Sequence, residues 1–227
     1  MIYLDKVTKI FANTRFETVS DITLDIEKGE FVSIIGHSGA GKTTLLKLIT
    51  GEIEPTKGKV FFDSVDISTL RGSKKTKYRR NIGMIYQDYR LISNKTVYEN
   101  IAFAMEVSGR SDEEIKNDVP HVLDLVALTG KENFFPDELS GGEKQRVAIA
   151  RAIVNNPDVI LADEPTGNLD PENTEDIIRI LEKINSFGTT IILTTHNKEV
   201  VRLINRRLIT MKNGVIVSDK KVNQDNI

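Results

Sequence analysis

Residues 31–50 read FVSIIGHSGAGKTTLLKLIT, which places an apolar run, a glycine-rich loop and a helical pattern in succession. The apolar run Phe31–Ile35 predicts a buried strand, and residues 42–50 predict the helix that follows. Between them, residues 36–43 fit the pattern G-x-x-x-x-G-K-[ST], in which backbone N–H groups and a helix N-terminus surround phosphate. The order of strand, loop and helix favours a phosphate-binding loop over an ordinary glycine-rich turn.

The side chains at the end of this loop indicate a nucleotide with a metal ion. Lys42 can place its positive charge on the β- and γ-phosphates, and the hydroxyl of Thr43 can ligate Mg²⁺. We therefore expect ATP and Mg²⁺ to be bound here. The residues expected to contact the nucleotide at this loop are Gly36, His37, Ser38, Gly39, Ala40, Gly41, Lys42, Thr43 and Thr44.

The rest of the chain alternates short apolar runs with amphipathic segments, which is typical of an α/β fold with a largely parallel sheet. Residues 159–162 and 189–195 predict two further buried strands, because they are rich in branched side chains. Residues 171–185 predict a helix with proline in its first turn. An Asn-Gly pair within residues 211–217 predicts a hairpin near the end of the chain.

The middle of the chain has helical patterns almost throughout. Residues 96–107 and 112–128 predict two helices, and a third follows before the strands resume. We interpret residues 88–155 as a helical subdomain inserted into a single domain that spans residues 1–227. The polar tail at residues 220–227 is expected to be frayed.

Composition excludes several classes of protein. The chain has 227 residues, a net charge of −2 and no cysteine, so disulfides and thiolate chemistry are absent and nucleic acid is not expected as a partner. No apolar run approaches the roughly 20 residues that a membrane-spanning helix needs. A strand-like segment at residues 2–4 leaves no room for a signal peptide. We expect a cytoplasmic protein that is soluble when isolated.

Two acids end an apolar strand at residues 159–164, which read VILADE. Ligands of open α/β sheets lie beyond the carboxyl ends of the strands, so Asp163 is placed to face a metal ion and Glu164 to polarise an attacking water. The alternative is a solvated turn, because Glu164 is followed by proline. The phosphate-binding loop favours the catalytic interpretation.

Two more polar residues end strand-like runs. His196 follows residues 189–195 and is expected at the same sheet edge, where it can contact the γ-phosphate or the water; it could also simply cap the next helix. Gln87 follows residues 83–86 and could contact Mg²⁺ or the water, or mark the hinge to the helical subdomain. Most glutamines at strand ends have no such role.

Residues 71–80, RGSKKTKYRR, form the most basic run. A solvated loop and helix face explains it most simply. Contact with anionic lipid headgroups is the alternative, if the chain lies beneath a membrane protein.

A second glycine-rich helix start lies at residues 139–152, LSGGEKQRVAIARA. Ser140 and Glu143 match a capping box, but this leaves the two glycines between them unexplained. Bare backbone at a helix start suits a bound phosphate. Because the chain already has a complete phosphate loop, we expect Ser140, Gly141 and Gly142 to meet a nucleotide held by a second copy of the chain.

Taken together, these motifs resemble those of the ABC-type ATPases. GHSGAGKT, Gln87, LSGGEKQ, ILADEP, residues 168–170 and His196 occur in the order of that family over essentially the whole chain. The resemblance implies a P-loop NTPase fold with a RecA-like core, an antiparallel β subdomain and an inserted helical subdomain. It also implies a homodimer that encloses two ATP molecules.

The family pattern also assigns roles to individual residues. It implies that Ser140, Gly141 and Gly142 contact the γ-phosphate held by the partner copy, and that Glu164 is the general base. It implies that residues 168–170, including Asp170, couple the two sites. Phe11 falls where the family usually has a tyrosine that stacks on adenine, with Phe16 as a rival.

Within the family, residues 36–49, 83–103 and 154–170 look most like the FtsE-type cell-division ATPases. That resemblance implies a polytopic membrane partner of FtsX type, with the chain peripheral to the cytoplasmic face of the membrane. ATP turnover would then activate peptidoglycan hydrolases outside the cell. The segment 89–101 would carry the docking groove for a cytoplasmic helix of the partner.

Two alternatives stay open. The lipoprotein-releasing and macrolide-exporting ATPases share the text ADEPTGNLD, so the same enzyme could serve an exporter. Soluble ATPases of DNA repair or translation usually carry long coiled-coil insertions or a second ATPase domain, and this chain has neither.

Overall fold

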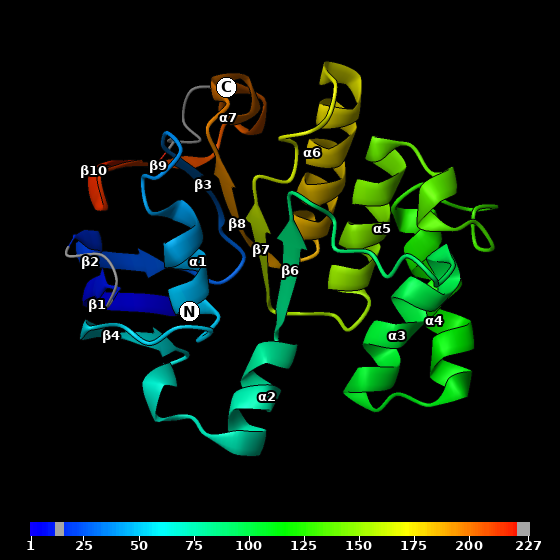
Figure 1. The fold of residues 1–227 in the computed structure, drawn as a ribbon, viewed down its shortest axis with the longest axis horizontal. Helices are drawn as coiled ribbons and strands as arrows, with labels where there is room; N and C mark the ends of the chain where they lie inside the picture. Colours follow the sequence, from blue (N-terminus) through cyan, green and yellow to red (C-terminus); the bar gives the residue numbers. More distant parts are fainter. Residues whose placement is uncertain (12–15, 222–227) are drawn as a thin grey trace.

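The strands form two sheets that lie one over the other in the computed structural model, which describes residues 1–11 and 16–221 (Figure 1). In the six-stranded sheet the neighbours β3, β6, β7, β8 and β9 run parallel, and β10 pairs antiparallel with β9. The order across this sheet is β10 (Val215–Lys220), β9 (Arg207–Lys212), β3 (Phe31–Ile35), β8 (Thr190–Thr195), β7 (Val159–Asp163) and β6 (Ile82–Tyr86).

The second sheet is antiparallel throughout. Its order is β2 (Glu17–Ile26), β1 (Ile2–Ile10), β4 (Lys57–Phe62) and β5 (Val65–Asp66). Apart from the segment at residues 2–4, these strands are not predicted from their own residues, because charged and polar side chains weaken the alternation along them. The resemblance to the ABC-type ATPases does predict an antiparallel part.

Alternate residues of the central strands enter two different cores. Val32 and Ile34 of β3 pack with α1 (Lys42–Ile49) and the antiparallel sheet, whereas Phe31 faces the opposite side. On that side, α6 (Pro171–Ser186), α7 (Lys198–Ile204) and the helices between β6 and β7 cover the sheet. Because both faces are covered, these strands are apolar at successive positions, as in other buried parallel sheets.

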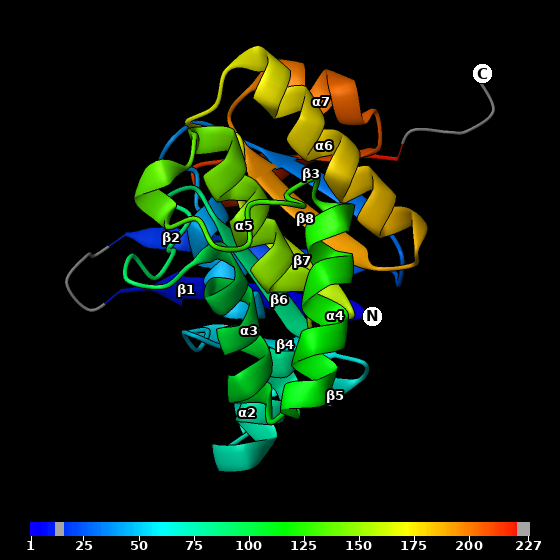
Figure 2. The ribbon, with the colours of Figure 1, turned by 90° about the vertical axis from the view of Figure 1, so that its right-hand side faces the viewer.

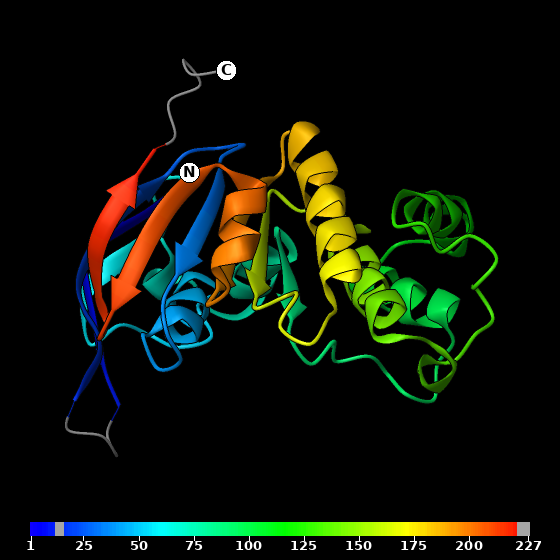
Figure 3. The same ribbon diagram turned by 90° about the horizontal axis from the view of Figure 1, so that it is seen from above.

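Three helices lie between β6 and β7 and project from one side of the sheets (Figure 3). They are α3 (Val97–Ser108), α4 (Asp112–Leu125) and α5 (Gly141–Ile153), and each begins with a capping box in which a Thr or Ser side chain accepts from a backbone N–H and a Glu carboxylate accepts in return. A separate helix, α2 (Gly72–Arg80), precedes β6, and two single 3₁₀ turns cover Ile67–Thr69 and Pro136–Glu138.

The sequence places most of these elements within two or three residues. Among the predicted helices the largest difference is at α4, predicted over residues 112–128, which ends at Leu125 because Ala127 takes a left-handed conformation. The Asn-Gly turn joins β9 to β10, with Asn213 and Gly214 both at positive φ, as a two-residue hairpin requires. Of the tail predicted to fray, Lys220 lies in β10, and residues 222–227 lie outside the described residues.

None of the helices in the described part of the chain combines the length and the apolar character needed to cross a bilayer.

Candidate functional site: two glycine-bearing helix starts

The loop between β3 and α1 wraps around the ammonium group of Lys42. The Nζ atom donates to the carbonyl oxygens of Gly36 at 2.7 Å and His37 at 3.3 Å, and the residue is only 6% exposed. Gly41 begins the helix in the left-handed conformation, with φ at +100°. The local geometry is that of a phosphate-binding loop, with a buried cation at its centre and a helix N-terminus at its end.

Glycine is required in this loop for two different reasons. A Cβ atom at Gly36 would lie 2.6 Å from the carbonyl oxygen of Met211, so β9 excludes a side chain there. Gly39 has φ at +78°, and a Cβ atom built on it would meet nothing within 4 Å. Gly36 is needed because the loop packs closely against β9. Gly39 is needed because its backbone is left-handed, although a side chain there would meet no other atom.

The two acids at the end of β7 are held by β8. The hydroxyl of Thr194 donates to Asp163 at 2.7 Å, and the backbone N–H of Glu164 is 3.2 Å from the same hydroxyl oxygen. Glu164 has φ at +51°, which is unusual for a residue other than glycine. Backbone strain of this kind concentrates at functional sites, because the surrounding structure must maintain it.

Glu164 connects Lys42 to His196. One carboxylate oxygen lies 3.0 Å from Lys42 Nζ, and the other lies 2.6 Å from His196 Nδ1. The Glu164 side chain is 15% exposed, whereas His196 is 60% exposed. The helix that follows is capped by Asn197, whose side chain accepts from Glu199 N–H, so His196 does not serve as that cap. Three residues that the sequence assigns to ATP chemistry are thus joined by two direct contacts through the Glu164 carboxylate.

Thr43 and Asp163 line the same cavity, which has a volume of about 330 Å³ and lies between α1, β6 and α2. Hydroxyl and carboxylate oxygens are the ligands that Mg²⁺ prefers. These two residues therefore fit the metal role that the sequence predicts for them. Within residues 1–11 and 16–221, no three His, Cys, Asp or Glu side chains gather to form a metal site.

Gln87 lies at the junction of the core and the helices. Its amide donates to Asn168 Oδ1 at 3.3 Å, and Asn168 donates back to the Gln87 carbonyl at 3.3 Å. A Cβ atom at Gly167 would lie 2.8 Å from Gln87 Nε2. The structure thus places Gln87 against residues 167–168, the segment that follows the acid pair.

The residues after Gln87 are fixed by α5. Tyr89 and Arg90 both have positive φ, and the guanidinium group of Arg151 donates to their carbonyl oxygens at 2.9 and 2.6 Å. The Arg90 guanidinium in turn stacks 3.7 Å from the centre of the Tyr86 ring. The turn after β6 is therefore hydrogen-bonded to α5, the helix that begins with Gly141 and Gly142.

Gly141 and Gly142 lie at the start of α5, where Ser140 is the N-cap. Ser140 and Glu143 form the predicted capping box, and the backbone N–H of Ser140 holds the pKa of Glu143 below its usual value. A Cβ atom at Gly142 would lie 2.0 Å from Asn173 Oδ1, on α6. The capping box leaves Gly142 unexplained, but its packing against Asn173 within the same chain explains it.

Gly141 is less constrained: a Cβ atom there would lie 3.3 Å from the Tyr89 hydroxyl and 3.6 Å from Leu169. Ser140 and Gly141 are both exposed. The hydrogen bonds of Ser140 go to Glu143 and Lys144, and none of them joins it to the loop around Lys42. Within one copy, the structure does not bring the two glycine-bearing helix starts together.

The remaining predicted residues lie around these two groups. Asp170 caps α6 and accepts from the backbone N–H and the side chain of Asn173 at 2.9 and 2.6 Å; these bonds lower the pKa of Asp170. Phe11 is half-buried, with Lys9 Nζ 5.3 Å from its ring centre, and Phe16 is 82% exposed. The two phenylalanines flank residues 12–15, which lie outside the described part of the chain.

Three residues that position the site are not predicted from the sequence. Thr194 orients the acid pair, Asn173 links Gly142 to Asp170, and Arg151 holds the turn after Gln87. Each contacts a partner more than 30 residues away in the chain or on a different helix, so no local pattern marks it. Thr194 alone has a signal in the sequence: it lies near the end of the strand predicted at residues 189–195, which is expected to reach the same sheet edge as Asp163.

Comparison with known proteins agrees with this geometry. The family model for the ABC transporter matches residues 19–167. The cell division ATP-binding proteins FtsE of Bacillus subtilis and Mycobacterium tuberculosis are 47% and 48% identical to the chain, over 97% of it and 96% of each relative. The methionine import ATP-binding protein MetN of Geobacillus kaustophilus is 45% identical over 98% of the chain and 66% of the relative.

The fold is also that of solved ATP-binding cassettes. The dimeric structure of the cassette MJ0796 in a post-hydrolysis state, bound to ADP and Pi, has a TM-score of 0.89 and 37% identity, and the match covers 98% of this chain and 99% of that one. The phosphate loop, the acid pair and the second glycine-bearing helix are thus set in a fold known to bind and hydrolyse nucleotide. The chain belongs to the ABC transporter family, as one of its ATP-hydrolysing domains.

Proposed function

We propose that the chain is the ATP-hydrolysing subunit of an FtsEX-like cell-division complex. In this role it would dimerise around ATP at the cytoplasmic face of the membrane and drive a polytopic partner of FtsX type that controls peptidoglycan hydrolysis. The observation that carries the proposal is the identity of 47–48% to FtsE proteins over nearly the full length of both sequences. Residues 36–49, 83–103 and 154–170, whose sequence resembles that of the FtsE-type ATPases, support the same assignment.

Hydrolysis would use the chain of contacts around Glu164. Lys42 is held by loop carbonyls and Glu164, and we expect its ammonium group to move to the phosphate oxygens when ATP binds. Glu164 would then orient and deprotonate the attacking water, with His196 holding the carboxylate from its other side. Bound Mg²⁺, held by Thr43 and Asp163 together with phosphate oxygens, would supply neutralising charge during phosphoryl transfer.

The active centre would be shared between two copies. Ser140 and Gly141 are exposed at the start of α5, a helix that lies on the other side of β6 and β7 from α1 (Figure 1). Their backbone N–H groups begin a helix of 13 residues, so they provide an anion site that a second copy can use. Dimeric ABC cassettes among the solved structures support this arrangement.

Replacing Glu164 by Gln tests the proposal directly. Loss of a general base should lower ATP hydrolysis by at least about a hundredfold, while ATP binding persists. The trapped nucleotide should hold two copies together, as a dimer peak in gel filtration with ATP. Glu113→Gln, on the exposed side of α4, is the matched control and should hydrolyse ATP at the wild-type rate. An E164Q protein that stays monomeric with ATP bound contradicts the shared site.

Mixing two inactive variants tests the sharing itself. Lys42→Ala removes the cation of the phosphate loop, and Ser140→Ala removes the cap of α5. In a mixture, each heterodimer has one centre with both parts intact, so activity should recover to about a quarter of the wild-type rate. No recovery, with both variants folded and able to associate, would mean that each copy holds a complete centre.

A membrane partner distinguishes this function from its alternatives. Co-purification from detergent-solubilised membranes should recover one polytopic protein without a transported substrate, bound through the groove at residues 89–101. The 45% identity to MetN favours methionine import as the second candidate. Recovery of a substrate-carrying permease instead would assign the chain to transport.

A further inference from the structure

The most basic segment of the chain is the helix α2, which none of the ATP chemistry uses. Between Asp66 and Asp88 the sequence has six lysines and arginines and no acidic residue. Figures 1 and 2 show α2 at one extremity of the molecule, beyond the antiparallel sheet and the helices of the subdomain. A cationic helix that projects into solvent is free to meet an extended anionic surface.

One side of α2 anchors it to the protein. Tyr78 is the buried residue of this helix; its hydroxyl donates to the Ile49 carbonyl, and its ring packs edge-on against Phe62 at 5.2 Å. Burial raises the pKa of the Tyr78 hydroxyl, so it remains a neutral donor. The position of α2 is therefore fixed without the help of its lysines.

The arginines of the segment also have structural partners. Arg79 donates to the carbonyl oxygens of Thr50 and Gly51 at the end of α1, at 3.3 and 2.9 Å. Arg80 donates to the Val107 carbonyl at 3.1 Å, and Arg71 lies 3.7 Å from Glu54. These cations are already engaged by carbonyl groups or a carboxylate.

The lysines differ from the arginines. In the part of the chain that the structure describes, Lys74, Lys75 and Lys77 have neither an ion pair nor a side-chain hydrogen bond; Lys74 and Lys77 are exposed and Lys75 is half-buried. Arg80, at the end of the same helix, donates to the carbonyl of Val107, an apolar residue whose exposed fraction is 61%. Lysines without ion-pair partners that lie close together on one helix are attracted to an anionic lipid surface.

We propose that Lys74, Lys75 and Lys77 of α2 bind the headgroups of anionic phospholipids directly. The occupant is a bilayer surface, since Lys74 and Lys77 are exposed on a helix at one extremity of the molecule, where they can meet an extended anionic plane (Figures 1 and 2). The net charge of −2 disfavours nucleic acid, whose protein partners are usually strongly basic. This contact is separate from any membrane partner and from ATP hydrolysis.

The test is sedimentation of the full chain with vesicles. Wild-type protein should bind vesicles of phosphatidylcholine with phosphatidylglycerol and leave pure phosphatidylcholine vesicles unbound. Each lysine near an anionic surface strengthens binding by about fivefold, so the triple variant Lys74→Gln, Lys75→Gln and Lys77→Gln should weaken it by about a hundredfold. Raising the salt concentration should weaken wild-type binding in the same direction.

Two control proteins make the result specific. Lys57→Gln, Lys116→Gln and Lys183→Gln together remove the same charge from exposed positions elsewhere, and this variant should bind like the wild type. Replacing the α2 lysines by arginine keeps the charge and should keep the binding. ATP hydrolysis and the melting temperature, measured on every variant, should be unchanged, so a defect in the ATPase is seen separately from a loss of lipid binding.

Three results would overturn the proposal. They are the absence of wild-type binding to anionic vesicles, equal losses in the α2 and control triple variants, and duplex DNA binding that is tighter than vesicle binding and lost with the α2 lysines. The last result would assign the helix to nucleic acid.

Discussion

Gly142 and Asn173 occupy one shared space between α5 and α6, and this contact changes the meaning of the glycine pair. The Asn173 amide lies where a side chain at 142 would be, and it is held there by Asp170 at 2.6 Å. A glycine can thus be required by its own chain and still leave backbone N–H groups bare for a phosphate. The sequence pattern reveals that glycine is needed but cannot separate these two reasons.

Two variants distinguish packing from phosphate binding as the reason for glycine at position 142. Gly142→Ala should lower the free energy of unfolding by about 1–2 kcal/mol, because the new Cβ atom displaces Asn173 from Asp170. Adding Asn173→Ala should recover about 1 kcal/mol relative to the sum of the single variants, as measured by urea denaturation. If the phosphate also needs bare backbone at 142, ATP hydrolysis stays low in the double variant. Strict additivity of the two stability changes would contradict the packing explanation.

At the scale of elements, the segment between β6 and α3 is ordered by one buried amide. Asn100 is fully buried in α3; its Oδ1 atom accepts from Ile92 N–H at 2.8 Å, and its Nδ2 atom donates to the carbonyls of Ile92, Lys95 and Thr96. Residues 92–95 therefore keep a fixed path without regular structure. This path includes part of the groove proposed to meet the membrane partner.

Asn100→Leu should leave the Ile92 N–H group and the Lys95 carbonyl without a protein partner. We expect a loss of about 2 kcal/mol in the free energy of unfolding, since a buried donor and acceptor lose their bonds together. The measurement is chemical denaturation followed by far-UV circular dichroism. Asn117→Ala, on the exposed side of α4, is the control and should change stability by less than about 0.5 kcal/mol. Equal stability of N100L and wild type would show that the segment does not depend on this amide.

The elements of the core and the site differ in how far the sequence predicts them. The strand ends that carry Asp163, Glu164 and His196 are predictable, because buried parallel strands are marked by apolar runs and their carboxyl ends meet at one edge. The contacts of Asn100, Asn173 and Arg151 are not, because each joins a helix to a loop or to a second helix, and the local pattern does not encode how these segments pack. Apart from residues 2–4, the antiparallel sheet is also missed from its own residues, since register shifts along β1 and charged side chains interrupt the alternation of apolar and polar residues.

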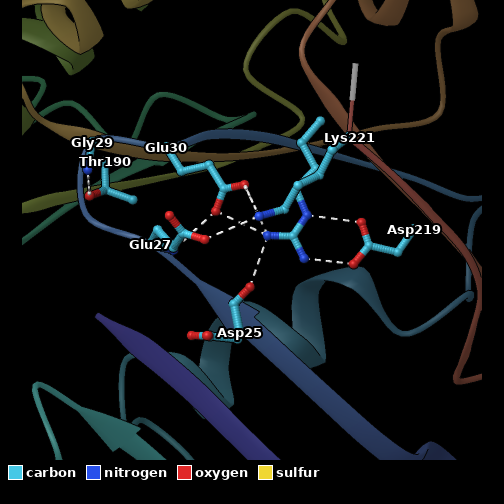
Figure 4. Close-up of polar contacts among 8 residues, drawn as sticks. Asp25, Glu27, Gly29, Glu30, Thr190, Asp219 and Lys221 are labelled. Atoms are coloured by element: carbon cyan, nitrogen blue, oxygen red, sulfur yellow. Dashed lines mark hydrogen bonds and ion pairs between the residues drawn. The ribbon is translucent and has the colours of Figure 1, made fainter. Parts of the chain in front are cut away.

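At the scale of the whole molecule, one guanidinium group joins the two sheets. Arg207 of β9 is buried and donates in a bidentate pair to Asp219 of β10, to Glu30, and to the carbonyl of Asp25 in β2, which belongs to the other sheet. Figure 4 shows these acids converging on a common centre, with Lys221 beside Glu27 and Glu30. A buried cation with this many partners fixes the orientation of the sheets, and removing one partner leaves charge uncompensated.

This cluster predicts how stability depends on pH. Hydrogen bonds from Arg207 lower the pKa of Asp219 in the folded protein, whereas the unfolded value is about 3.9. A lowered folded pKa adds stability that is fully present above the unfolded value and is lost as the pH falls through the folded value. Wild-type stability should therefore include a contribution from Asp219 at neutral pH that disappears in acid.

Asp219→Asn isolates this contribution. The variant should be less stable than the wild type by about 1 kcal/mol at pH 7, at the low end for a charged hydrogen bond because the Asp219 side chain is 36% exposed. The difference should begin to shrink as the pH falls below about 4, where the carboxylate of the unfolded chain becomes neutral, and it should disappear below the lowered pKa of the folded protein. Asp124→Asn, at an exposed position of α4, should show no such convergence. Urea denaturation at a series of pH values measures the stability of both variants and of the wild type. If the stability difference between D219N and the wild type stays constant down to acid pH, Arg207 stabilises the sheets by its shape and packing rather than by its charge.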